Sequence, residues 1–574
     1  MSPAELMPTT LHADPGPEPA QAAPEASVRA AGRPEAGRPE AFLALDRGTA
    51  TLAGSIVGRV EGRWRLLAAT ALPAGSDPGA LLRLLVDRLR SADPPLAEVT
   101  LGRPDGDLES IDGWPQLVAM SAPAATIAVI AATDKTRARL EEAALGAGWN
   151  VVGGSAERTD PLALTRLATR PGVDALLVGV ADPPDADERE LAAELAVAAA
   201  GIAVRRPGLR IFLSGNVPDA PLLGVVRDPV VVRLAAPPRM PGEAAPASLR
   251  LALAAARRGP LDSRGALAAA AGSLARVLGL RVEILDIGVS GAARVLAAPG
   301  PGDDGEIVAD VRMVEVPGAA LFRIDRPGTT ERIDYWFTHG LDRARLRDRL
   351  AELALAPWSD LDGDGALLRA AALRAALERL LEVTRPTLGD DGVDVVIGTG
   401  GAWSAMPGPA AAHVIADVIR RPGAMQVAVD HARLLGPIGT IADDAERDVL
   451  CADLAEDALL RLGTIVTPRG MRPNRAVGHL AIASGRVHSD VELVAGGLTL
   501  VDLPPGASGT AELTFRGAAD LGVRGHRFQV EVTGGLAGLV LDLRDVPLRL
   551  PERPDRRREI LATWEQALWP ERDA

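Results

Sequence analysis

The chain is 574 residues long, carries a formal net charge of −14 at pH 7, and has one lysine, Lys135, among its 62 basic residues. This length suffices for about three or four domains with buried cores, the scattered arginines argue against nucleic-acid binding, and the absence of any Gly-Lys-Ser/Thr step excludes a P-loop. A single cysteine, Cys451, excludes an internal disulfide, and the absence of any HxH or HExxH pair argues against a zinc site. No apolar run reaches the roughly 18–20 residues that a membrane span needs, and no signal peptide is evident. We therefore expect a cytoplasmic protein without a membrane partner.

The first ordered unit begins near residue 41. Residues 1–40 are rich in Pro, Ala, Glu and Gly, which predicts a disordered tail. Three short apolar runs, an amphipathic helix at 78–90 and a short strand near 99–102 then predict a β-β-β-α-β unit over residues 41–123. Asp46-Arg47-Gly48-Thr49 lies at its first turn.

A different pattern follows over residues 124–236, where strands and helices alternate regularly. This alternation predicts an inserted domain with a parallel sheet and helical crossovers. Residues 237–279 predict a linker followed by two helices rich in Ala and Leu.

The first pattern then returns over residues 280–477. Asp286-Ile287-Gly288 lies at the first turn of this second unit, as Asp46 does in the first, and Ser290 follows it. Later, Val395–Ile397 predicts a buried strand that ends in Gly398-Thr399-Gly400-Gly401, where missing side chains allow a ligand to approach the backbone. Residues 478–552 predict a small all-β domain, and residues 553–574 predict a terminal helix.

Two Asp-x-Gly turns at equivalent places of a repeated order, with a Gly-Gly loop after the second, resemble the actin, Hsp70 and sugar-kinase (ASKHA) superfamily. The resemblance implies an α/β, two-lobed actin-like fold with the inserted parallel α/β domain and the C-terminal all-β domain, and ATP or ADP with magnesium in the cleft. It implies that Asp46 and Asp286 orient magnesium and water as catalytic and metal-binding residues. The implied nucleotide contacts are Gly48, Thr49, Gly288 and Ser290 near the phosphates, and Gly398, Thr399, Gly400 and Gly401 near the adenosine.

Within that superfamily, residues 41–570 are similar to the glutamate mutase L family, also called MutL or GlmL. Members are associated with adenosylcobalamin-dependent mutases, as ATP-linked reactivation or chaperone-like accessories. The similarity therefore implies a nucleotide-responsive accessory protein whose partner is a mutase subunit. The segments that carry it are LALDRGT, SGN, LDIG, VVIGTGGAWSAMP, AVDHARLLGPIGTIA, LGTIVTPRG and GLVLDLRDVPLRLP.

Both phosphate turns depart from the pattern of that family. Arg47 replaces an aromatic residue, and Leu52 and Ala53 stand where the family has Thr and Lys. The second turn continues as Val289-Ser290-Gly291-Ala292-Ala293 in place of Gly-Ala-Thr-Thr-Asp. These losses predict a weak or inactive ATPase. The alternative is a small-molecule kinase of the same fold, which would need a catalytic base and a substrate pocket in the cleft.

Overall fold

The protein was analysed as a computed structural model that describes most of residues 41–568. The predicted tail, residues 1–40, and most of the predicted linker lie outside the described residues. The other ranges outside the description are 102–113, 122–124, 148, 185, 226–230, most of 238–262, 303–306, 325–327, 360, 390–391, 472–474, 485–486, 545 and 569–574.

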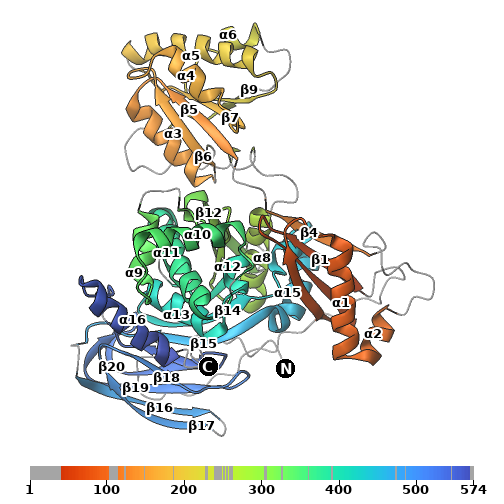
Figure 1. Cartoon of the computed structure of the whole chain (residues 1–574), viewed down its shortest axis with the longest axis vertical. Coiled ribbons are helices and arrows are strands. Elements are labelled where there is room, and N and C mark those ends of the chain that lie inside the picture. The colour runs from red at the N-terminus through yellow and green to blue at the C-terminus, as the bar shows by residue number, and fades with distance from the viewer. Residues whose placement is uncertain are drawn as a thin grey trace.

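The described chain is a mixed α/β protein with several sheets (Figure 1). The first sheet has the strand order β3-β2-β1-β4, and helix α1 packs against it through leucines spaced along one face, including Leu81, Leu85 and Leu89. The bounds of these elements are β1 Ala41–Arg47, β2 Thr51–Val60, β3 Arg63–Pro73, α1 Pro78–Ala92 and β4 Gln116–Met120.

The strand predicted near residues 99–102 is wrong. Helix α2 (Pro94–Leu101) occupies that segment, because prolines suit the first turn of a helix and the Asp93 carboxylate accepts a hydrogen bond from the Leu96 N–H at 3.0 Å. The strand that completes the sheet comes later, as β4, and runs parallel to β1.

The second sheet repeats the order of the first at one end. Its eight strands run β12-β11-β10-β13-β14-β15-β21-β18, so β12-β11-β10-β13 matches β3-β2-β1-β4. The register also matches, because Asp286 pairs with Ala293 as Asp46 pairs with Ala53. The bounds are β10 Val282–Ile287, β11 Ala292–Pro301, β12 Ile307–Val316, β13 Val395–Thr399, β14 Gly423–Asp430, β15 Leu459–Thr467, β18 Leu498–Val501 and β21 Leu539–Asp542.

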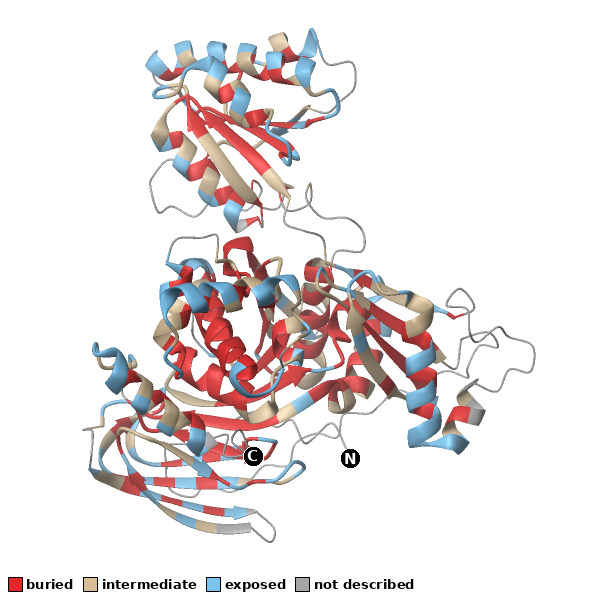
Figure 2. Cartoon of the chain, viewed as in Figure 1, coloured by how far each residue is buried: buried red, intermediate tan, exposed pale blue. Residues whose placement is uncertain are grey.

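Helices fill the space between these two sheets and cover the far side of the second. Side chains of α8, α14 and α15 form one core with Phe42 and Val57 of the first sheet and Ile284 of the second. Helices α9, α10, α11 and α13 pack with the other face of the second sheet, where Figure 2 shows a largely buried interior. The bounds are α8 Ser263–Leu278, α9 Thr329–Trp336, α10 Arg343–Leu355, α11 Gly363–Leu388, α13 Gly408–Val418, α14 Leu435–Gly439 and α15 Asp444–Ala458.

The segment after β4 forms a third sheet with the order β6-β5-β7-β8-β9, at the top of Figure 1. All of its strand pairings are parallel, as the alternating pattern predicts. The bounds are β5 Thr126–Ala131, α3 Asp134–Gly146, β6 Asn150–Ser155, α4 Pro161–Ala168, β7 Ala175–Gly179, α5 Ala186–Arg205, β8 Arg210–Ser214, α6 Ala220–Leu223 and β9 Val231–Leu234.

The C-terminal strands divide between two sheets, which corrects the prediction that residues 478–552 form one separate all-β domain. An antiparallel sheet has the order β17-β16-β19-β20, whereas β18 and β21 join the second sheet beside β15. Burial explains the division, because β21 is buried at every residue while β19 and β20 alternate between exposed and buried residues. The bounds are β16 Ala476–Ser484, β17 Val487–Val494, β19 Ser508–Asp520, β20 Arg524–Thr533 and the terminal helix α16 Pro554–Leu568.

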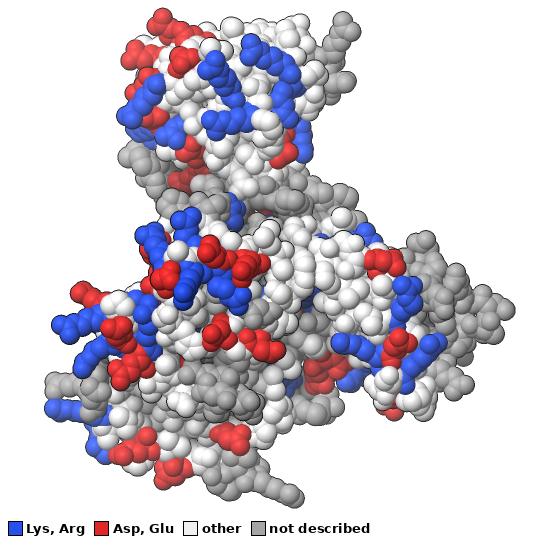
Figure 3. All heavy atoms as spheres, viewed as in Figure 1, with Lys and Arg blue, Asp and Glu red and all other residues white. Residues whose placement is uncertain are grey.

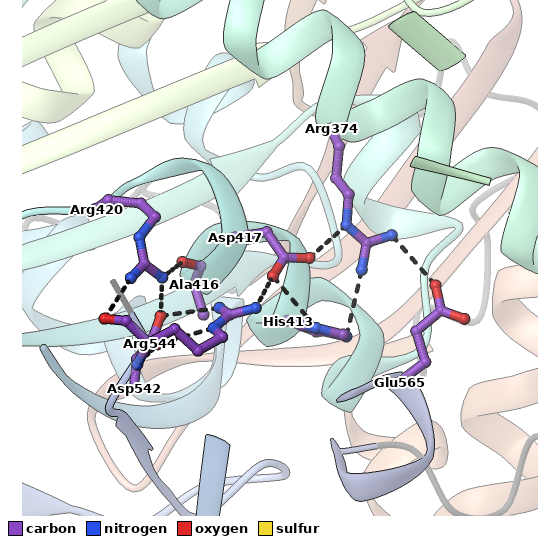
Figure 4. A network of polar contacts seen from close by, with 8 residues as sticks. All are labelled: Arg374, His413, Ala416, Asp417, Arg420, Asp542, Arg544 and Glu565. Atoms are coloured by element: carbon purple, nitrogen blue, oxygen red, sulfur yellow. Dashed lines mark hydrogen bonds and ion pairs between the residues drawn. The ribbon is translucent and has the colours of Figure 1, made fainter. Parts of the chain in front are cut away.

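A buried network of charged side chains fastens this C-terminal part to helices α11 and α13 (Figure 4). Asp417 of α13 accepts hydrogen bonds from Arg374 of α11 and from Arg544, which follows β21, both at 2.6 Å. Arg544 also pairs with Asp542 at 2.8 Å and lies 4.5 Å from the ring centre of Trp564 in α16. Helices α11 and α13 are thereby joined through paired charges to the end of β21, and α16 is joined to it through Trp564.

No helix among the described residues is both long and apolar enough to cross a membrane. On the face of the molecule in Figure 3, basic and acidic side chains are interspersed over the described surface.

Candidate functional site

A cavity of about 300 Å³ lies between the first and second sheets. The two Asp-x-Gly turns approach it from the two sheets, and the Gly-rich loop after β13 forms a further wall. The sequence-predicted residues that line it are Asp46, Gly48, Thr49, Asp286, Gly288, Ser290, Thr399, Gly400 and Gly401.

The two turns have the same backbone hydrogen bond. The Gly48 N–H donates to the Thr51 carbonyl oxygen at 2.9 Å, and the Gly288 N–H donates to the Gly291 carbonyl oxygen at 3.0 Å. The second pair lies 240 residues after the first, because Gly288 corresponds to Gly48 and Gly291 corresponds to Thr51. The repeat seen in the sheets therefore extends to the turns that face the cavity.

The Gly-rich loop lies directly against the second turn. Gly400 has a φ of 88°, and a Cβ placed there would lie 2.4 Å from Oδ1 of Asp286 and 2.8 Å from the Ile287 carbonyl oxygen. The prediction that Gly398 contacts the nucleotide is corrected, since Gly398 does not line the cavity. A Cβ at Gly398 would lie 2.6 Å from the Trp403 ring, so this glycine makes room for a buried tryptophan rather than for a ligand.

Two buried arginines that sequence reasoning missed lie on the predicted carboxylates. Arg433, which follows β14, places Nη1 3.5 Å from Oδ2 of Asp46 and donates to Oγ1 of Thr51 at 2.6 Å. Arg264, near the start of α8, places Nε 3.4 Å from Oδ2 of Asp286 and Nη1 3.4 Å from Glu315. No local pattern marks these two among so many arginines, because each contact depends on the packing of distant segments.

Burial of the two aspartates changes their acidity. Burial raises the pKa of Asp286 to about 6, with Arg264 opposing the rise and nearby Asp46 adding to it. Burial also raises the pKa of Asp46, and the Arg433 guanidinium opposes that rise. The two carboxylates thus share a poorly hydrated site, and the charge of Asp46 adds to the raised pKa of Asp286.

A third buried carboxylate, Asp430 at the end of β14, supports the wall of the cavity. It accepts hydrogen bonds from Oγ1 of Thr399 at 2.9 Å and from the N–H groups of Leu434 and Leu435 at 2.9 and 3.2 Å. These bonds fix both the end of the Gly-rich loop and the turn that carries Arg433. Burial raises the pKa of Asp430 to about 6, against the effect of these hydrogen bonds.

The side chains present do not fit magnesium between Asp46 and Asp286. Magnesium needs carboxylate oxygens that face it and water, whereas each of these carboxylates lies beside a guanidinium and Asp286 also abuts Gly400. Two unit charges 4 Å apart interact by about 4 kcal/mol at an effective dielectric constant of 20, so a guanidinium beside each carboxylate cancels much of the attraction that the carboxylate would offer to a cation. Among the described residues, no group of three or more His, Cys, Asp or Glu side chains could hold a metal ion.

The mouth of the cavity is apolar. Trp358 and Leu361 line it, and these two residues remain 42% and 40% exposed. An exposed tryptophan ring offers a flat surface on which a heterocyclic base can stack. Trp358 lies far from the Gly-rich loop in sequence and was also missed by sequence reasoning.

Comparison with known proteins gives little further information. No family model matches the chain, and no curated protein matches it. Two solved structures of the Ppx/GppA phosphatase of Aquifex aeolicus are similar at 10% sequence identity, covering 72% of this chain and 88% of that one, with a TM-score of 0.17. A TM-score this low supports no conclusion about a shared activity. The resemblance to the glutamate mutase L family therefore stays a prediction.

Proposed function

We propose that this protein has a two-lobed actin-like fold and binds ATP or ADP in the cavity between its first two sheets. One observation carries the proposal: two turns with the same hydrogen bond, in sheets of the same strand order, converge with a Gly-rich loop on one cavity. Backbone N–H groups in tight turns suit phosphate oxygens, and the Trp358 ring suits the base.

The finer function that we propose follows the family resemblance. The protein acts as a nucleotide-responsive accessory of an adenosylcobalamin-dependent mutase, with a reactivation or chaperone-like role. ATP and ADP would favour different arrangements of the two sheets and hence different affinities for the mutase subunit, since a ligand that binds two states equally shifts neither. Arg433 supports this coupling because it reaches from the second sheet to Asp46 and Thr51 of the first.

Calorimetric titration with ATP and ADP tests the binding site. Trp358→Ala should weaken binding at least tenfold, about 1.4 kcal/mol, through loss of stacking. Leu355→Ala is the matched control, because Leu355 is an apolar residue that is 83% exposed and does not line the cavity. No heat of binding with either nucleotide would reject the proposed site.

A pull-down tests the partner. Tagged protein incubated with extract of its native host should recover a mutase subunit, and replacing ATP by ADP should change the yield. Equal recovery with both nucleotides would contradict the nucleotide-responsive role, and absence of any mutase under both conditions would contradict the accessory role.

A small-molecule kinase of the same fold is the second candidate, and one observation favours it. The pKa of Asp286, raised by burial to about 6, is near the range that suits a general base at neutral pH. Against it, Arg264 lies on the same carboxylate and no histidine lines the cavity in the described part of the chain. Transfer of labelled phosphate from ATP to a small alcohol or acid would favour this candidate.

A further inference from the structure

We propose that the guanidinium groups of Arg433 and Arg264 take the place of a divalent cation in this cleft, so that the cavity binds the polyphosphate of a nucleotide without metal. The inference rests on the proposed nucleotide site and concerns how that site balances charge. Its starting point is that magnesium is expected between Asp46 and Asp286, whereas an arginine lies beside each of these carboxylates.

Buried structure fixes the position of Arg433 between the two sheets. Its side chain is 5% exposed, and its backbone has a φ of 53°, a conformation that residues other than glycine seldom adopt. Asp430 holds the turn that carries it through the N–H groups of Leu434 and Leu435. The guanidinium is therefore positioned by buried structure and not by a mobile surface segment.

Arg433 also has donors to spare. Among the described residues its partners are Asp46 and Thr51, and both contacts are made through Nη1. A guanidinium carries five N–H donors in a planar fork, which leaves Nε and Nη2 for the oxygens of a phosphate group. Asp46 and a phosphate can thus share one arginine.

Arg264 provides the equivalent charge at the second turn. Its side chain is 5% exposed and lies between Asp286 and Glu315. A Cβ at Gly291 would lie 2.9 Å from Nη2 of Arg264, which places this guanidinium against the turn that approaches the phosphates. Each Asp-x-Gly turn therefore has its own arginine, one from the loop after β14 and one from α8.

The charges that line the cavity agree with a bound polyanion. Arg264, Arg369 and Arg433 line it together with Asp46 and Asp286, and Glu315 pairs with Arg264, so the arginines already equal these carboxylates in number before any metal is added. A polyphosphate would meet arginines that neutralise its charge and match the geometry of its oxygens. A magnesium ion would be repelled by the same arginines.

The first test is a pair of calorimetric titrations of the full chain with ADP and ATP, one in excess EDTA and one in excess magnesium chloride. We expect binding in EDTA with an affinity within about threefold of that in magnesium, or tighter. Binding that appears only with magnesium would overturn the inference and leave the proposed function intact. Absence of binding under both conditions would overturn the proposed function and this inference with it.

Three variants sharpen the test. Arg433→Gln should lower affinity in EDTA at least tenfold, and Arg433→Lys, which keeps the charge but loses the fork, should recover part of that loss. Asp46→Asn should raise affinity in EDTA about threefold or more, because it removes a competitor for Arg433 and leaves the guanidinium in place. An affinity in EDTA that is unchanged or lower in Asp46→Asn contradicts the inference, since it would show that Asp46 does not compete with the phosphates for Arg433.

The matched control is Arg276→Gln. Arg276 lies on α8 like Arg264, pairs with Asp448 at 2.8 Å and does not line the cavity, so its loss should leave nucleotide affinity unchanged. Thermal unfolding followed by circular dichroism establishes that each variant is folded before it is titrated. If Arg276→Gln lowers affinity as much as Arg433→Gln, the effect of Arg433 is one of general stability and the inference fails.

Discussion

Gly400 illustrates what single residues contribute to the site. The sequence predicts that Gly400 faces a ligand because it follows a buried strand. The structure shows a second reason for a glycine at this position. The backbone at Gly400 packs against the Asp286 carboxylate, so the residue must be glycine even in the absence of any ligand. The same position serves close packing between the loop and the turn.

The packing at Gly400 can be measured with Gly400→Ala. The added methyl group would collide with Asp286 and force a left-handed backbone on alanine, so we expect a loss of about 2–3 kcal/mol in the free energy of unfolding. Gly389→Ala is the control, since Gly389 also has a positive φ, 73°, but nothing lies within 4 Å of its Cβ position. In urea denaturation, Gly389→Ala should lose at least about 1 kcal/mol less free energy of unfolding than Gly400→Ala, because its methyl group meets no neighbouring atom. Equal losses would mean that the contact with Asp286 relaxes at no cost.

Asp430 makes folding stability depend on pH. Its folded-state pKa, about 6, lies above the usual 3.8, so the folded state binds this proton more tightly than the unfolded state does. The stability that the neutral form contributes is therefore present below about pH 4 and is lost as the pH rises towards 6, a change of about 3 kcal/mol. Asp430→Asn cannot lose a proton. In urea denaturation, the free energy of unfolding of this variant minus that of the unmodified protein should be larger at pH 7 than at pH 4.5. If this difference stays constant with pH, the raised pKa of Asp430 is contradicted.

The residues of the site differ in how far sequence could reveal them. Asp46 and Asp286 could be predicted because each lies in a local turn that recurs at the same place of a repeated unit. Arg264 and Arg433 could not, because their roles arise from contacts with other elements, 22 and 51 residues away for Arg264 and 382 residues away for the contact of Arg433 with Thr51. Trp358 likewise reaches the cavity only through the packing of helices.

At the scale of elements, local signals predicted a helix with one apolar face and a strand that is apolar throughout. Helix α1 has leucines on one face, and the strand before the Gly-rich loop has a continuous apolar run, so both could be located in advance. The strand predicted near residues 99–102 is instead the end of helix α2, whose two prolines stand in its first turn. The membership of β18 and β21 in the second sheet depends on long-range pairing that no local pattern records.

The attachment of the C-terminal elements depends on Asp417. Burial alone would raise the pKa of this carboxyl, yet His413, Arg374 and Arg544 hold it well below its usual value. Asp417→Asn would leave two buried guanidinium groups short of a counter-charge, and we expect a loss of about 3–5 kcal/mol in the free energy of unfolding. Glu352→Gln, which removes an exposed partner of Arg349, should change stability by less than about 0.5 kcal/mol. A loss below about 1 kcal/mol in Asp417→Asn would show that the network rearranges around the missing charge.

At the scale of the whole molecule, the two sheets with matching order are joined at several places around the cavity. The β3 edge of the first sheet contacts α15 through Arg65 and Asp457, whose Nη2 and Oδ1 atoms lie 2.6 Å apart. Closer to the cavity, Oγ of Ser121 lies 2.9 Å from Oγ of Ser263. Because Arg433 also spans the gap, a ligand in the cavity would act on contacts that hold the two sheets together. The repeated order itself could be predicted from the sequence, whereas these contacts between the repeats could not.

The same arrangement bears on catalysis by the whole cleft. Hydrolysis of ATP needs a positioned water and groups that stabilise charge on the transferred phosphate, and removal of one such donor commonly costs about a hundredfold to a thousandfold in rate. The second turn lacks the hydroxyl residues found in the family that the sequence resembles, and the carboxylates expected to orient magnesium and water lie beside arginines. We therefore expect turnover far below about one per second.

A steady-state phosphate-release assay at saturating ATP, run once with magnesium and once with EDTA, measures this turnover. The expected outcome is a rate close to background in both conditions, even where calorimetry detects bound nucleotide. Asp286→Ala is the control, because a true hydrolytic site would lose its activity with that carboxylate. Turnover of about one per second or faster with magnesium, abolished by Asp286→Ala, would show that the arginines move away from the carboxylates when nucleotide binds and that the cleft is an active ATPase.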